Sequence, residues 1–325
     1  MAFAQLKPQN KQSVLNSSVS KSIIKTLAYF DVFSYPITFN EIYEYASIKS
    51  AAVLFEEELN ILLKNEVIFK TGDFYALSNN PLLAIKRNNE NRLAKEQLPQ
   101  AIKVGKFIGK LPFVKAVGIS GSLSKNVAYD NSDFDYFIIT ETNRLYVCRF
   151  ILGLYRRFTK LLKKEYHVCC NYIIDENHLI IPEKNIYTAI EIASLIPVAG
   201  KNVLLNFYYE NNWRNATLPN ERRHIIPATK KIILKQSLEI LIGNIFGNIL
   251  DSLFRKIAIK RFNNLIKKGK NYNKRGLCFA QFDKHICKNT PGTFQNKLLD
   301  KYKKRLQNLE SKWNINLETE HLFSL

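Results

Sequence analysis

Two small residues and two acids form the stretch of the sequence whose residue types and spacing are best suited to chemistry. Gly121 and Ser122 follow an apolar run over residues 113–119. Ten residues separate Ser122 from Asp133, which together with Asp135 opens a second apolar run. Such runs, rich in Val, Ile and Phe, indicate strands, which a turn and a short helix would join. Strand side chains alternate between faces, so the two acids should share one face, about 7 Å apart.

A pair of carboxylates at this spacing favours a cation between them, because the two negative charges otherwise repel each other. Mg²⁺ prefers one or two carboxylates, with water and nucleotide phosphates as its other ligands. The simpler interpretation is a corner between two strands that carries solvated acids, and the order, spacing and strand context favour the metal site over it.

The Gly121-Ser122 turn and the Asp133-x-Asp135 pair resemble the signature of the polymerase-β-type nucleotidyltransferase superfamily, in particular its minimal nucleotidyltransferases. The resemblance covers about residues 100–182. It implies a mixed α+β fold in which helices flank a nucleotidyltransferase-type sheet. It also implies transfer of a nucleoside monophosphate from a nucleoside triphosphate (NTP) to a hydroxyl acceptor, with Mg²⁺ or Mn²⁺ bound by Asp133 and Asp135.

Around the turn, the family pattern Gly-Ser-x-Ala-Arg-Gly is only partly kept. Ser124, Lys125 and Asn126 stand where Ala, Arg and Gly are usual. Asn accepts a positive φ more readily than most residues, so the last of these replacements is mild. The resemblance implies that Gly121, Ser122 and Lys125 bind the nucleotide phosphates, since a turn at a helix start presents free N–H donors to an anion.

A third carboxylate usually comes from a following strand in this family, and here the candidate strand covers residues 165–175. Alternation would put Asn171 in the middle of its cleft-facing side, and Asn has no basic carboxylate. Three alternatives stay open: Asp175 or Glu176 completes the site, two carboxylates suffice, or the chain binds nucleotide or nucleic acid as a catalytically degenerate regulatory protein.

The N-terminal region is expected to contain a disordered leader, residues 1–20, and a domain over residues 21–83. Three helices and a hairpin in that domain resemble a winged helix-turn-helix, with Thr38 and Glu41 spaced as a capping box. Residues 1–83 hold seven bases, none of them Arg, against eight acids, a net charge of −1. Phosphate neutralisation supplies most non-specific DNA affinity, so we expect protein contact rather than DNA binding, which also weakens a transcription-regulator interpretation.

The remaining chain divides into a nucleotidyltransferase-like domain over residues 84–216 and a basic helical domain over residues 217–325. The latter carries 22 bases against eight acids, and residues 252–282 contain nine bases and no acid. Either a solvated helix face or a surface for RNA or another polyanion explains this charge.

Cysteine and histidine spacing gives no clear metal motif, and the five cysteines are expected to be reduced thiols of a cytoplasmic protein. We expect Cys278, His285 and Cys287 to pack rather than to bind zinc, and His178 to lie in a surface turn. The first 20 residues lack the apolar segment of a secretory signal, and the longest apolar stretch is too short and too polar to span a membrane.

Overall fold

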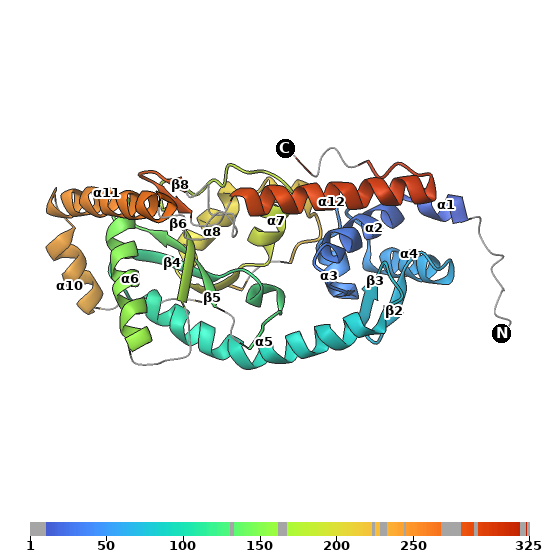
Figure 1. Cartoon of the computed structure of the whole chain (residues 1–325), viewed down its shortest axis with the longest axis horizontal. Helices are drawn as coiled ribbons and strands as arrows, with labels where there is room; N and C mark the ends of the chain where they lie inside the picture. Colours follow the sequence, from blue (N-terminus) through green and yellow to red (C-terminus); the bar gives the residue numbers. More distant parts are fainter. Residues whose placement is uncertain are drawn as a thin grey trace.

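The chain is a mixed α+β protein, and its described residues form two separate β-sheets, as Figure 1 shows. The computed structural model describes residues 11–130, 133–161, 168–222, 225–227, 233–243, 245–267, 281–288, 292–318 and 323. A sequence-based expectation that falls outside these ranges, such as the disorder of residues 1–10, lies outside the described residues.

Residues 11–77, the N-terminal unit, contain four helices around a small antiparallel sheet with strand order β1-β3-β2. The helices are α1 (Lys11–Asn16), α2 (Ser18–Asp31), α3 (Phe39–Glu44) and α4 (Ala52–Lys64), and the strands are β1 (Ile37–Thr38), β2 (Phe69–Thr71) and β3 (Phe74–Ala76). Thr38 caps α3, and the Glu41 carboxylate returns a bond to the Thr38 backbone, so the predicted capping box is confirmed. The expected leader is wrong for residues 11–20, because these are helical and bury Val14 and Leu15 in the core.

The second sheet has six strands in the order β7-β4-β5-β6-β9-β8. They are β4 (Val114–Ile119), β5 (Phe134–Thr140), β6 (Val168–Asp175), β7 (Ile196–Ala199), β8 (Gln281–Phe282) and β9 (Ile286–Lys288). Strands β4 and β5 are antiparallel, and the connection between them contains the short 3₁₀ helix η1 (Leu123–Lys125). Strands β5 and β6 are parallel, which requires a crossover, and α6 (Leu145–Leu161) lies in it.

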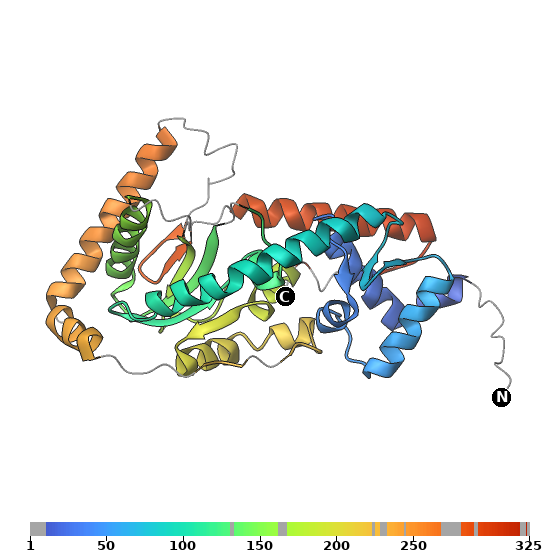
Figure 2. The same ribbon diagram turned by 90° about the horizontal axis from the view of Figure 1, so that it is seen from below.

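A single long helix, α5 (Pro81–Ile108), joins the N-terminal unit to this sheet, as Figure 2 shows from below. Near its C-terminal end, the carbonyl of Ala101 accepts a 2.7 Å hydrogen bond from the Tyr136 hydroxyl on β5. Near its N-terminal end, Arg87 is buried against Glu41, with 2.5 Å between guanidinium and carboxylate. The helix therefore fixes both parts of the molecule relative to each other.

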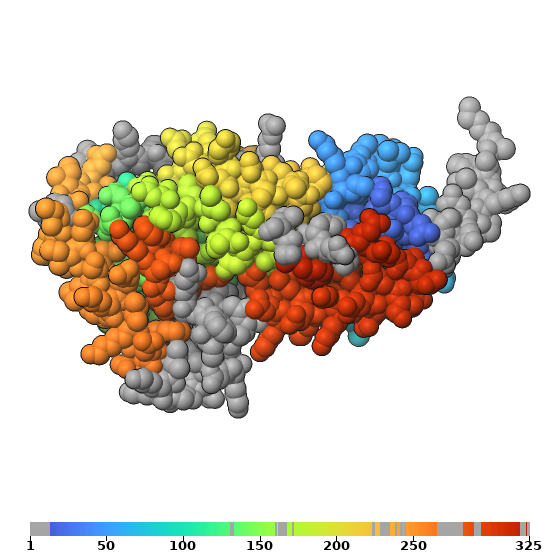
Figure 3. Space-filling view, turned by 90° about the horizontal axis from the view of Figure 1, so that it is seen from above, coloured from blue at the N-terminus to red at the C-terminus, as the bar shows by residue number. Residues whose placement is uncertain are grey.

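The described elements of residues 217–325 pack on earlier parts of the chain. Two helices, α10 (Ile233–Ile242) and α11 (Ile245–Lys267), come next in the sequence. Helix α11 contacts α6, where Phe254 of α11 stacks on Phe150 of α6 with ring centroids 4.3 Å apart. Strands β8 and β9 extend the second sheet. Helix α12 (Gly292–Trp313) packs on α2, where the Tyr302 hydroxyl donates to the Lys25 carbonyl at 3.1 Å. In Figure 3 its red surface adjoins the blue N-terminal helices.

Three shorter helices complete the described structure: α7 (Ile186–Ala193), α8 (Lys201–Glu210) and α9 (Arg214–Thr217). Ile186, Ala189 and Ile190 of α7 belong to the same core as the N-terminal unit, so α7 lies between that unit and the sheet. None of the helices in the described ranges is long and apolar enough to cross a membrane.

Candidate functional site

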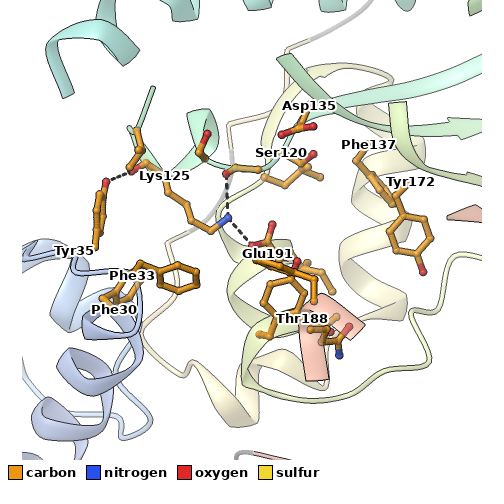
Figure 4. Close-up of a pocket in the computed structure, with 18 of the residues that line it drawn as sticks. Phe30, Phe33, Tyr35, Ser120, Lys125, Asp135, Phe137, Tyr172, Thr188 and Glu191 are labelled. Atoms are coloured by element: carbon orange, nitrogen blue, oxygen red, sulfur yellow. Dashed lines mark hydrogen bonds and ion pairs between the residues drawn. The ribbon is translucent and has the colours of Figure 1, made fainter. Parts of the chain in front are cut away.

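A cavity of about 400 Å³ lies where the N-terminal unit, the second sheet, α7 and α12 meet (Figure 4). Its wall is mainly aromatic and aliphatic, with a few charged side chains placed among them: Lys86, Glu90, Lys125, Asp135, Glu191 and Lys288. Ser120, Gly121 and Ser122 line the same cavity. An apolar pocket with a few converging polar groups is the usual form of a small-molecule site.

The Asp135 carboxylate lies directly against the Gly-Ser bend, which we define as residues 120–125. Gly121 has φ +69°, and a Cβ on it would lie only 2.3 Å from Oδ2 of Asp135. The Ser120 amide donates to the Asp135 carbonyl at 2.9 Å, so the backbone of the bend is bonded to the strand that carries the acid. Only Gly satisfies both the positive φ and the absence of a Cβ at this contact.

The rest of the bend is held by its own hydrogen bonds. The Ser122 carbonyl accepts from the amides of Lys125 and Val127, at 2.9 and 3.1 Å. Ser124 donates from its hydroxyl to the Gly121 carbonyl at 2.9 Å, whereas the Ser122 side chain forms no capping bond. Asn126 has φ +60°, the conformation expected where the family pattern has Gly. The bend is thus fixed while the Ser122 side chain lines the cavity.

Lys125 is folded back over the bend rather than extended into solvent. Its Nζ lies 2.7 Å from a carboxylate oxygen of Glu191 on α7 and donates to the Gly121 carbonyl at 3.1 Å. Figure 4 shows this side chain directed toward Glu191. The Lys125 carbonyl accepts a 2.9 Å bond from the Tyr35 hydroxyl of the N-terminal unit. An anion that used this ammonium would therefore have to compete with Glu191.

Asp133 and Asp135 differ in their surroundings. Asp133 immediately precedes β5 and is exposed, and it is not one of the described residues that line the cavity. Asp135 is half-buried and lines it. The residues between and after them, Phe134 and Tyr136, are buried at 2% and 0% exposure, so the burial alternates along this segment.

Neither Asp175 nor Glu176 can supply a third carboxylate beside Asp135. In the parallel pairing of β5 and β6, Asp135 lies beside Cys169, whereas Asp175 lies beside Thr140 at the other end of β5. Five residues of strand separate the two positions, roughly 17 Å. The alternative that Asp175 or Glu176 completes the site is therefore excluded by distance.

The expected alternation along β6 is also wrong, because the pairing register shifts between Cys169 and Tyr172. Such an irregularity reverses which residues of a strand face a given side. Tyr172 pairs with Phe137, and both line the cavity, so the cavity-facing position beside Phe137 belongs to Tyr172.

Several cavity residues give no sequence signal. The Tyr172 hydroxyl is buried and has no hydrogen-bond partner among the described residues. Burial raises the pKa of Tyr172, so its hydroxyl keeps its proton and is available as a donor. Glu191 has a weaker signal: it is the sole charged residue of α7, and a lone charge in an apolar helix indicates a buried partner.

In comparisons of this chain with models of protein families, with curated proteins and with solved structures, nothing matches.

Proposed function

We propose that the cavity binds the phosphates of a nucleoside triphosphate at the Gly-Ser bend, and that the chain transfers the nucleoside monophosphate to a hydroxyl acceptor. The observation that carries the proposal is the contact between Asp135 and Gly121. The space beside a carboxylate that is held against a glycine bend fits only a small cation, or a phosphate oxygen that such a cation bridges to the carboxylate.

The strand order also supports a nucleotidyltransferase-type sheet. An antiparallel pair, β4 and β5, flanks the bend, and a parallel strand, β6, follows beside the acid-bearing strand. The N-terminal unit has the element order of a winged-helix-like domain. Its aromatic residues Phe30, Phe33 and Tyr35 line the cavity, which favours a structural role for that unit over contact with DNA.

Asp135, with Asp133 two residues before it, is a fitting set of ligands for Mg²⁺ or Mn²⁺, because carboxylate oxygens are the donors these ions prefer. A bound ion would neutralise charge on the phosphate oxygens. The chain itself contributes three further effects. The bend positions a phosphate group, Lys125 offers a cation when a phosphate displaces Glu191, and the aromatic wall excludes water from the reacting groups.

A second candidate function is nucleotide binding without transfer. The observation in its favour is that Cys169, not an acid, lies beside Asp135, so the base that would accept the proton of the acceptor hydroxyl has no assigned residue. In that case ligand binding in the cavity would act on the N-terminal unit, as in a regulatory protein. Exposed Lys256, Lys260 and Arg261 on α11 keep an RNA or polyanion surface as a prediction under either function.

The proposal is tested with purified protein, Mg²⁺ or Mn²⁺, and each of the four NTPs labelled on the α-phosphate. Total RNA and total protein from an extract serve as acceptors. We expect label transfer with at least one nucleotide, and its loss in Asp135→Asn. The matched control is Asp130→Asn, an exposed acid on the same connection that is not among the cavity-lining residues.

Binding is measured in parallel with a fluorescent NTP analogue. Glu191→Gln releases Lys125 from its ion pair, so binding should tighten, and Lys125→Met should weaken it. Binding without transfer would support the second function. An absence of binding in the native protein, or binding unaffected by Asp135, Lys125 and Glu191 substitutions alike, would refute both.

A further inference from the structure

We propose that Asp175, His178 and His285 form a binding site for one zinc-type divalent ion, separate from the cavity. The three side chains, the Asp-His-His cluster, come together at the end of β6 and the β8–β9 turn. One ligand atom of each lies within 4.8 Å of those of the other two.

The centre of the cluster is a fully buried carboxylate. Asp175 has 0% exposure, and its two oxygens contact different imidazoles: Oδ2 lies 2.6 Å from Nδ1 of His285, and Oδ1 lies 3.2 Å from Nδ1 of His178. The two rings stack with centroids 3.5 Å apart and planes inclined by 21°. Both imidazoles thus present the same nitrogen to one acid.

Backbone hydrogen bonds hold Asp175 and the segment of His285 in place. The Asn177 amide donates to Asp175 Oδ1 at 3.1 Å, and the Asp175 amide donates to the His285 carbonyl at 3.1 Å. On the other segment, Asp283 Oδ1 accepts from the amides of His285 and Ile286, at 2.7 and 2.6 Å, which fixes the β8–β9 turn. A site whose ligands are positioned by their own backbone loses little entropy when a metal binds.

The donor set selects the type of metal. Two imidazole nitrogens and one carboxylate suit zinc and its neighbours, whereas Mg²⁺ favours oxygen ligands. Bonds of 2.0–2.2 Å in a tetrahedral site separate ligand atoms by roughly 3.3 Å. The 3.2 Å contact to His178 already has that spacing, and the 2.6 Å contact to His285 must open by roughly 0.7 Å as the metal replaces a hydrogen bond.

The ion can reach the site from solvent, because the side chains of His178 and His285 are 47% and 27% exposed. Three protein ligands leave the fourth position for water. The metal would join two segments that are 110 residues apart, the end of β6 and the β8–β9 hairpin at the edge of the sheet.

The test uses the full chain after dialysis against a chelator. Titration with Zn²⁺ in a calorimeter, with metal content measured after gel filtration, should give one tightly bound ion per chain. The His178→Ala/His285→Ala variant should lose at least about tenfold in affinity. Asp73→Asn, an exposed acid in the β2–β3 turn, is the control and should bind as the native chain does.

A second measurement identifies the ligands. Co²⁺ bound in place of Zn²⁺ should give the visible absorption bands of a site with nitrogen and oxygen ligands. These bands should vanish in His178→Gln, a single substitution that replaces the double variant in the test if the double variant does not fold. Thiolate-to-cobalt charge-transfer bands would place the metal at cysteines and overturn the proposal. So would native affinity in the histidine variants, or no stoichiometric binding by the native chain. Asp135→Asn should retain the ion, because Asp135 belongs to the other end of the sheet.

Discussion

Replacing Gly121 by Ala tests whether the Asp135 carboxylate really lies against the Gly-Ser bend. The new Cβ would meet Oδ2 of Asp135 at 2.3 Å and its Cγ at 3.0 Å, distances that require the side chain to move. Gly72 in the β2–β3 turn is a matched control, because it also has a positive φ, +59°, and a Cβ there would meet nothing within 4 Å.

The magnitude follows from separating the backbone cost from the contact. A left-handed conformation costs an L-residue about 1–2 kcal/mol, and the lower entropy of the unfolded chain offsets about 0.4–1 kcal/mol of it. Gly72→Ala should therefore destabilise by about 1 kcal/mol. Gly121→Ala carries the same backbone cost, and driving Asp135 off its rotamer with loss of packing adds about 1–2 kcal/mol, giving about 2–3 kcal/mol in total.

The assay is urea unfolding, monitored by tryptophan fluorescence. It is applied to Gly121→Ala, to Gly72→Ala and to a double-mutant cycle of Gly121→Ala with Asp135→Ala. Removing Oδ2 and Cγ leaves the Asp135 Cβ, at 3.1 Å, as the nearest atom, so the excess cost of Gly121→Ala should fall to below about 0.5 kcal/mol. The reasoning is refuted if the two glycine variants lose equal stability, or if the excess persists without the Asp135 carboxylate.

Three further predictions concern contacts away from this pair. Tyr35→Phe removes the hydroxyl that donates to the Lys125 carbonyl, and should cost about 0.5–1.5 kcal/mol in urea unfolding while weakening NTP-analogue binding. Arg87→Met leaves the Glu41 carboxylate without its buried partner and should lower the free energy of unfolding by about 3–5 kcal/mol. The double variant Arg87→Met/Glu41→Gln should lose clearly less stability than the single variant. Equal losses would contradict a charge effect. Burial raises the pKa of the Cys287 thiol from its ordinary value of 9.0 to about 11, so the native chain keeps a proton that the unfolded chain releases. Stability should therefore fall as pH rises from 9 to 11, by up to about 2–3 kcal/mol for this group, and Cys287→Ala should flatten the unfolding profile in that range by the same amount.

The local part of the candidate site was predictable from the sequence. Gly121, Asp133 and Asp135 lie within 15 residues, and short-range patterns determine a turn between two strands. The positive φ of Asn126 follows from the same local chemistry. In contrast, placing a third carboxylate requires knowing which side chains of β6 face the cavity. A register irregularity between Cys169 and Tyr172 changes which residues these are, and no Gly or Pro marks it in the sequence.

The walls of the cavity were not predictable, because they come from segments far apart in the chain. Glu191 reaches Lys125 across 66 residues, and His285 reaches Asp175 across 110. Sequence spacing carries no information on such pairs, because the tertiary fold and not the order of the chain brings them together. The same limit applies to the C-terminal helices: their amphipathic pattern shows that a face is buried, but not whether it packs on its neighbours or on the other end of the molecule.

The N-terminal unit is best understood as one wall of the site rather than as an independent module. Residues 1–83 carry a net charge of −1, which disfavours DNA, and the aromatic residues at the end of α2 line the cavity instead. Tyr35 holds the backbone of the Gly-Ser bend, while Arg87 on α5 stacks on the Tyr35 ring at 3.6 Å and pairs with Glu41. A ligand that displaces Glu191 from Lys125 therefore acts on a bend that is bonded to both halves of the molecule. Binding in the cavity and the attachment of the N-terminal unit must then be coupled, since each stabilises a conformation of the same six-residue segment.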